Sequence, residues 1–89
     1  MGYEYRVETY TIHGNQLTKL FREHALFTFE DAGSFHFGRS SDCPLFTARL
    51  ETDYVYLLQH VATSETDALL GLFIRSILSQ NDHVVISEL

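Results

Sequence analysis

The sequence predicts a single small α+β domain, in which an antiparallel sheet carries one or two helices packed on a face. Several short segments alternate apolar and polar residues, as half-buried strands do. Residues 65–79 instead repeat their apolar positions at helical spacing, and turn residues separate the segments at short intervals. Because 89 residues is the length of one ordinary domain, residues 1–89 are treated as one unit.

The first two elements are predicted to be a strand over residues 3–12 and a short helix over residues 16–25. Aromatic and β-branched residues alternate with charged ones in the strand, so Tyr3, Tyr5, Val7 and Thr9 share one side and Glu4, Arg6 and Glu8 share the other. His13-Gly14-Asn15 supplies the turn, and Asn15 is the expected helix cap. Residues 16–25 fit helical spacing better than alternation.

Residues 26–37 are predicted to form a hairpin, with its turn at Asp31-Ala32-Gly33-Ser34. Strict alternation turns His36 away from an apolar side that is made of Phe27, Phe29, Phe35 and Phe37. Four phenylalanines on one side form a large apolar surface, which a helix, another sheet or a partner must cover.

The remaining elements follow a loop at residues 38–44. Two strands are predicted at residues 45–50 and 54–61, joined at Glu51-Thr52-Asp53. The second segment also fits a helix, but its Tyr-Val-Tyr centre favours a strand. Next comes the helix at residues 65–79, with Ser64 as its N-cap and Asp67 in the capping-box position. A last strand is expected at residues 83–88.

This order of elements is compatible with two topologies. If one hairpin is set aside, the order βαββαβ of a ferredoxin-like fold remains. If residues 16–25 are a strand instead, the chain becomes a small meander or barrel closed by its C-terminal helix, as in pleckstrin-homology or phosphotyrosine-binding domains.

Charge is distributed unevenly along the chain. The net charge is −6, and residues 50–89 contribute most of it because they hold six acidic side chains and a single arginine. Direct nucleic-acid binding is therefore not expected, since phosphate backbones are bound by clustered Lys and Arg. An acidic half suits a protein partner with a basic surface. No apolar run approaches the roughly 18 to 20 residues needed to span a bilayer, so we expect no membrane association.

The single cysteine, Cys43, excludes an internal disulfide and a multi-cysteine zinc site within one chain. Residues 1–6 do not resemble a signal peptide, so we expect a cytoplasmic location. The five histidines show neither HxxxH nor HxH spacing, and we expect no metal and no cofactor. His36 and His60 are the candidates for a catalytic base, although no nucleophile or orienting acid is adjacent to them in the sequence.

Two short segments resemble phosphopeptide-binding families. Residues 37–43, Phe-Gly-Arg-Ser-Ser-Asp-Cys, resemble the glycine-arginine-serine turn of forkhead-associated domains, which implies that Arg39 and Ser40 contact a phosphate. Residues 26–30, Gly38-Arg39 and residues 45–48 together resemble the end of an insulin-receptor-substrate-type phosphotyrosine-binding domain. That resemblance implies phosphotyrosine recognition by Arg22 and Arg39.

The function that the sequence favours is non-catalytic binding of a protein partner by occlusion, as an inhibitor, antitoxin, immunity or adaptor protein. Proteins of this size and kind are common products of phages and other mobile elements. The expected partner-binding residues are Glu51, Asp53, Glu65, Asp67, Tyr54 and Tyr56. Self-association is expected because the apolar surface is large for 89 residues. The alternatives are a small dimeric ferredoxin-like enzyme that uses a histidine, and a phosphopeptide-binding module.

Overall fold

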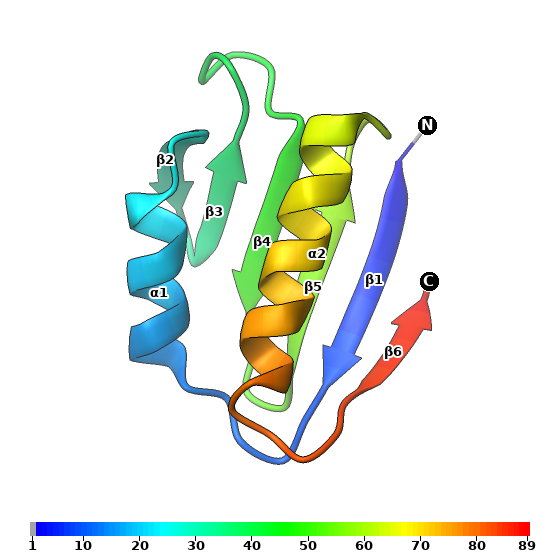
Figure 1. Ribbon diagram of the computed structural model, residues 1–89. Coiled ribbons are helices and arrows are strands. Elements are labelled where there is room, and N and C mark those ends of the chain that lie inside the picture. Colours follow the sequence, from blue (N-terminus) through cyan, green and yellow to red (C-terminus); the bar gives the residue numbers. More distant parts are fainter. Residues whose placement is uncertain (1) are drawn as a thin grey trace.

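The computed structural model describes residues 2–89 and has the predicted element order, with two helices and six strands (Figure 1). The elements are β1 (Tyr3–Glu8), α1 (Gly14–Glu23), β2 (Phe27–Asp31), β3 (Ser34–Phe37), β4 (Phe46–Leu50), β5 (Tyr54–Gln59), α2 (Ser64–Leu78) and β6 (Val85–Glu88). The α+β class is therefore confirmed, and the segment after Asp53 is a strand rather than a helix.

All six strands form one antiparallel sheet in the order β2-β3-β4-β5-β1-β6. Strands β2 to β5 follow each other as a meander, and β1 lies between β5 and β6. The sheet is open, so the barrel alternative is wrong. The four-strand ferredoxin-like order is not confirmed in its simple form, because β3 and β4 lie between β2 and β5.

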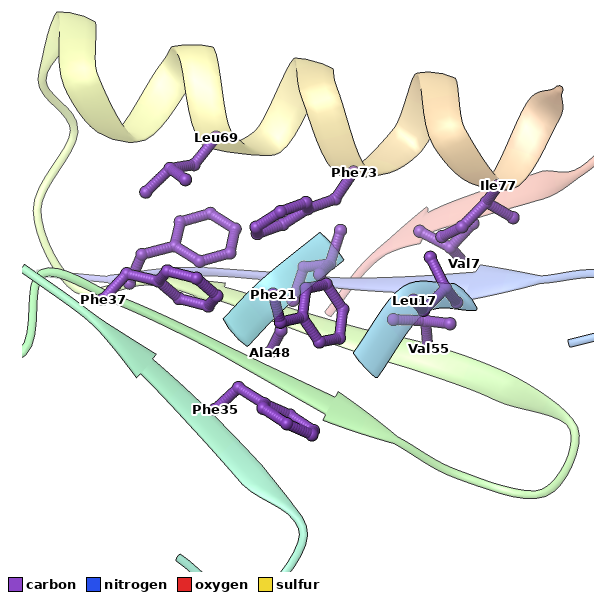
Figure 2. Packing of buried hydrophobic residues seen from close by; sticks show 12 residues of the cluster. Val7, Leu17, Phe21, Phe35, Phe37, Ala48, Val55, Leu69, Phe73 and Ile77 are labelled. Atoms are coloured by element: carbon purple, nitrogen blue, oxygen red, sulfur yellow. The ribbon is translucent and has the colours of Figure 1, made fainter. Parts of the chain in front are cut away.

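Both helices lie on the same side of the sheet (Figure 1). Helix α2 lies in front of β4 and β5, and α1 lies at the β2–β3 end of the sheet, where Phe21 contacts Phe35 of β3. The helices bury Leu17 and Phe21 from α1 and Leu69, Phe73 and Ile77 from α2 against inward-facing strand residues (Figure 2). Each phenylalanine or leucine buried in this way contributes roughly 1.5–3 kcal/mol. This shared apolar layer holds the helices to the sheet.

The predicted face of four phenylalanines is wrong at one position. A β-bulge shifts the register between Phe27 and Phe29, so Phe27 pairs with Phe37 but Phe29 pairs with His36. An extra residue in a strand reverses the alternation of the side chains that follow it. Phe29 therefore leaves the helix side and stacks on the His36 ring on the opposite face, with ring centroids 4.4 Å apart.

The caps of both helices also differ from the prediction. The N-cap of α2 is Thr63 rather than Ser64, and Thr63 forms a capping box with Thr66 rather than Asp67. Thr66 is fully buried, and its hydroxyl also donates to the Val61 carbonyl oxygen. The Thr63–Thr66 pair therefore fixes the start of the helix more firmly than the predicted Ser64–Asp67 pair. Helix α1 begins at Gly14 after His13, with no side-chain cap from Asn15.

Several strands are shorter than predicted. The first strand ends at Glu8 rather than at residue 12, β5 ends at Gln59, and β6 begins at Val85. Tyr10 consequently lies outside any strand, where it is almost fully exposed and contacts the His83 ring edge-on. Alternation in the sequence extends beyond the residues that have a pairing partner in the sheet.

The predicted turn between β2 and β3 is confirmed, with positive φ angles at both central residues, 49° at Ala32 and 83° at Gly33. This backbone matches the mirror-image turns that join twisted antiparallel strands. Gly33 adopts it freely, whereas Ala32 has a Cβ atom that crowds the left-handed conformation at a cost of roughly 1 kcal/mol.

Replacing Ala32 should therefore change stability in a predictable direction. We expect Ala32→Asn to raise the free energy of unfolding by about 0.5–1 kcal/mol, because asparagine tolerates the left-handed region. Ala32→Val should lower it, since a β-branched side chain fits this conformation poorly. Urea denaturation of the three proteins measures both changes, and equal stability of the Asn and Val variants would contradict the assigned turn.

Candidate functional site

The sheet has a second face that no helix of residues 2–89 covers, and we call it the open face. The strand register places on it alternate residues from all six strands. These residues are Glu4, Arg6 and Glu8 of β1, Phe29 of β2, Ser34 and His36 of β3, Thr47 and Arg49 of β4, Tyr54, Tyr56 and Leu58 of β5, and Val85 and Ser87 of β6. The open face contains a depression of about 480 Å³ that reaches from His36 and His60 to Arg6.

One end of the depression is organised by a hydroxyl that joins two histidines. The Thr47 Oγ1 atom lies 3.0 Å from His36 Nδ1 and 2.8 Å from His60 Nε2. Thr47 lies opposite His36 in the β3–β4 register, and the backbone amide of His60 donates to the Leu45 carbonyl oxygen just before β4. Pairing of the strands therefore brings the three side chains together.

This arrangement restricts the protons of the two neutral rings. A hydroxyl has one proton to donate, so Thr47 donates to one ring nitrogen and accepts from the other. In one arrangement His36 Nδ1 donates to Thr47 and Thr47 donates to His60 Nε2. In the other, His60 Nε2 donates to Thr47 and Thr47 donates to His36 Nδ1. Burial lowers the pKa of His60, and the nearby His36 lowers it further. Neither ring forms a hydrogen bond with a carboxylate among residues 2–89.

The middle of the open face is formed by a tyrosine and an arginine. The Tyr56 hydroxyl donates to Glu4 Oε1 at 2.5 Å, and the Arg49 Nε donates to Ser34 Oγ at 3.0 Å. Burial, followed by the bond to Glu4, raises the pKa of Tyr56 to about 12. Tyr56 therefore stays a neutral donor across the physiological range.

The other end of the open face is acidic around a tyrosine. Tyr54 pairs with Glu8 of β1, and its carbonyl oxygen accepts from the amide of Glu51. The Arg6 guanidinium lies over the Tyr54 ring, 4.1 Å from its centroid, and its Nε is 3.1 Å from Glu8 Oε1. Arg49 lies 3.9 Å from Glu51, so the two arginines partly balance the carboxylates. Such exposed ion pairs contribute little to stability.

The structure brings four of the six expected partner-binding residues together. Tyr54, Tyr56 and Glu51 line the same depression, and Asp53 lies beside Glu8 at the acidic end. Glu65 and Asp67 lie instead in the first turn of α2, on the helix side. Glu65 pairs with Arg39 at 2.7 Å, and Asp67 accepts from Gln59 Nε2 at 2.8 Å. The predicted acids thus do not form one continuous face.

The arginines implied by the phosphopeptide resemblance are engaged with separate carboxylates. The Arg22 guanidinium binds Glu30 through two hydrogen bonds of 2.9 and 3.1 Å. The Arg39 guanidinium binds Glu65. Within residues 2–89, no group of three or more His, Cys, Asp or Glu side chains is placed to hold a metal ion. Cys43 is a free, exposed thiol.

Four residues of the open face, Arg6, Glu8, Thr47 and Arg49, were not among the candidate site residues predicted from the sequence. Alternation does place Arg6 and Glu8 together on one side of the first strand, so their shared face could be predicted from the sequence. Thr47 and Arg49 have no local signal, because their roles depend on residues 11 to 15 positions away in the chain, His36 and Ser34.

Comparison of the chain with models of protein families, with curated proteins and with solved structures finds no match. No helix of residues 2–89 is both long enough and apolar enough to cross a lipid bilayer.

The lowered pKa of His60 predicts how stability varies with pH. Because folding disfavours protonation of this ring, its contribution is complete above the ordinary pKa of 6.5 and is lost as the pH falls through the lower folded value. We expect the free energy of unfolding to fall more steeply between pH 7 and pH 5 in the wild type than in His60→Gln. Urea titrations across that range measure both slopes, and parallel slopes would show that the His60 proton is not coupled to folding.

Proposed function

We propose that this chain is a small, non-catalytic protein-binding protein that acts by occluding a protein partner, with the open face as its interface. The observation that carries this proposal is the composition of an entire uncovered sheet face. Tyrosine and arginine, the residue types enriched at interface hot spots, occupy its centre. Lysine, which interfaces disfavour, is absent from it, since the one lysine of the chain is Lys19 in α1.

Binding has more support than catalysis in the details of this face. The two histidines are hydrogen-bonded to a threonine, whereas a catalytic base is usually oriented by an acid and positioned beside a nucleophile. Many polar groups already satisfy each other, as in the Tyr56–Glu4 and Arg49–Ser34 bonds. A face whose side chains are held in place loses little conformational entropy when a partner binds.

The partner is expected to present basic side chains to the acidic end of the open face. Glu8, Glu51 and Asp53 lie near Tyr54 there, and Arg6 and Arg49 balance only Glu8 and Glu51, so a lysine or arginine of the partner would gain a carboxylate contact at this end. We propose a cytoplasmic location, because a single exposed thiol such as Cys43 suits a reducing compartment.

The open face can be tested by comparing variants in affinity capture from the native host. We expect Tyr54→Ala and Glu51→Lys to reduce recovery of the partner about tenfold or more, because they remove an aromatic contact and reverse a charge. Lys19→Ala on the opposite side of the molecule is the matched control and should retain binding. Circular dichroism confirms folding, and a partner that all four proteins retain equally would contradict the proposed interface.

We also propose that the chain self-associates through the free edge of β6. The Leu89 amide donates to the Glu4 carbonyl oxygen, so antiparallel alternation points the backbone groups of Ile86 and Glu88 away from β1. Val85 and Ile86 on this strand are 54% and 45% exposed. The other edge, β2, has a bulge and ends in Glu30 and Asp31, features that discourage edge pairing.

Two substitutions at Ile86 separate backbone pairing from simple apolar contact. We expect Ile86→Pro to abolish a dimer, because proline removes the outward amide while the β1–β6 bonds remain. Ile86→Ala loses most of the side chain but keeps the amide, and should weaken the dimer less. Sedimentation equilibrium over a range of concentrations measures this, and a wild type that stays monomeric throughout would refute self-association.

A further inference from the structure

The helix layer covers only part of the sheet. In Figure 1, α1 and α2 lie in front of β2 to β5, whereas β1 and β6 have no helix in front of them. The helix side of these two strands carries Tyr3, Tyr5 and Ile86, which share that side with Gln59 and Val7 through the strand register. Tyr3 and Ile86 are 41% and 45% exposed, which is unusual for side chains on the core side of a sheet.

One flank of α2 borders this uncovered region. Asp67 accepts a hydrogen bond from Gln59, which pairs with Tyr3, so this flank of α2 faces β1. Leu70, Ile74 and Leu78 follow Asp67 at helical spacing on the same flank, and Leu78 is 42% exposed. We call the surface formed by Tyr3, Tyr5, Ile86, Leu70, Ile74 and Leu78 the β1–β6 strip.

The width of the strip matches one helix. Neighbouring strands lie about 4.8 Å apart, and a helix with its side chains is about 10 Å across, so one helix covers two strands. The two existing helices divide the other four strands between them, with α1 at the β2–β3 end of the sheet and α2 over β4 and β5. A third helix beside α2 would complete the layer over all six strands.

The charges that border the strip are acidic. Glu88 pairs with Tyr5 across the β1–β6 ladder, and Asp67 lies on the neighbouring flank of α2. Burial raises the pKa of Tyr5, and the charges of Glu88 and Asp67 raise it further, which agrees with both acids lying close to this ring. The strip has no lysine or arginine, and the exposed Arg75 lies on the solvent side of α2. An occupant with basic residues would therefore be favoured over an acidic one.

We propose that the β1–β6 strip binds an amphipathic helix of a partner protein, whose apolar side packs between α2 and β6 and whose basic residues face Asp67 and Glu88. This is the helix-in-groove mode of recognition, in which apolar anchors at helical spacing supply affinity and flanking charges supply selectivity. The strip lies on the opposite side of the sheet from the open face, so both surfaces can be occupied together and the chain can act as an adaptor.

Two synthetic helical peptides provide the test. Both carry the same leucine and isoleucine face, and their polar positions are lysine in one and glutamate in the other. Titrated with the full chain in fluorescence anisotropy, the lysine peptide should bind saturably and the glutamate peptide at least about tenfold more weakly. Raising the salt concentration should reduce this difference, because the charges at the rim of the strip are screened.

Variants assign the binding to the strip. Leu78→Arg should reduce the affinity for the lysine peptide about tenfold. Glu88→Gln should reduce this affinity less, and should make it depend less on the salt concentration. Arg75→Ala, on the solvent side of the same helix, is the matched control and should not weaken binding. Because Leu78 and Glu88 are exposed, these changes should leave the fold intact, which circular dichroism verifies.

Three results would overturn the proposal. The first is equal affinity for the two peptides, and the second is equal loss of binding in Leu78→Arg and Arg75→Ala. The third is a concentration-dependent dimer that Leu78→Arg dissociates, because a second copy of the chain would then occupy the strip. Loss of partner capture by open-face variants has no bearing on these outcomes, so the two proposals fail independently.

Discussion

The contact among Phe21, Phe37 and Phe73 is the interaction on which the rest of the structure depends. The Phe73 ring centroid lies 4.8 Å from that of Phe21 and 5.2 Å from that of Phe37, so it joins both helices to β3. Each helix has one wide apolar side, and the two can share these rings only from the same face of the sheet. The opposite face is consequently left to side chains that tolerate water, and this asymmetry creates the open face.

The two uncovered surfaces differ in chemistry because they arise from different constraints. The open face is polar and aromatic, and its side chains are tied together by bonds such as those from Thr47 to two histidines. The β1–β6 strip is apolar because it continues the core side of the sheet beyond the reach of two helices. Its exposure follows from size, since residues 2–89 form six strands and two helices, and two helices do not cover six strands.

Much of the local structure could be predicted from the sequence. Alternation identified the strands, helical spacing identified both helices, and Asp31-Ala32-Gly33-Ser34 identified a tight turn. Glu51, Tyr54 and Tyr56 line one depression because they follow each other closely around one turn, and their role in partner binding stays a prediction. Glu65 and Asp67 were expected with them by charge alone, but net charge in a segment does not specify which side of the sheet its residues occupy.

The sequence by itself determined the kind and order of the elements, because helical periodicity, alternation and turn chemistry depend on residues a few positions apart. Only the tertiary structure decided that β1 lies between β5 and β6, which pairs Tyr3 with Gln59 from the other half of the chain. It also decided that a bulge carries Phe29 onto His36 and that Thr47 bridges His36 and His60. These features depend on register between distant strands, where a shift of one residue exchanges the two faces of the sheet.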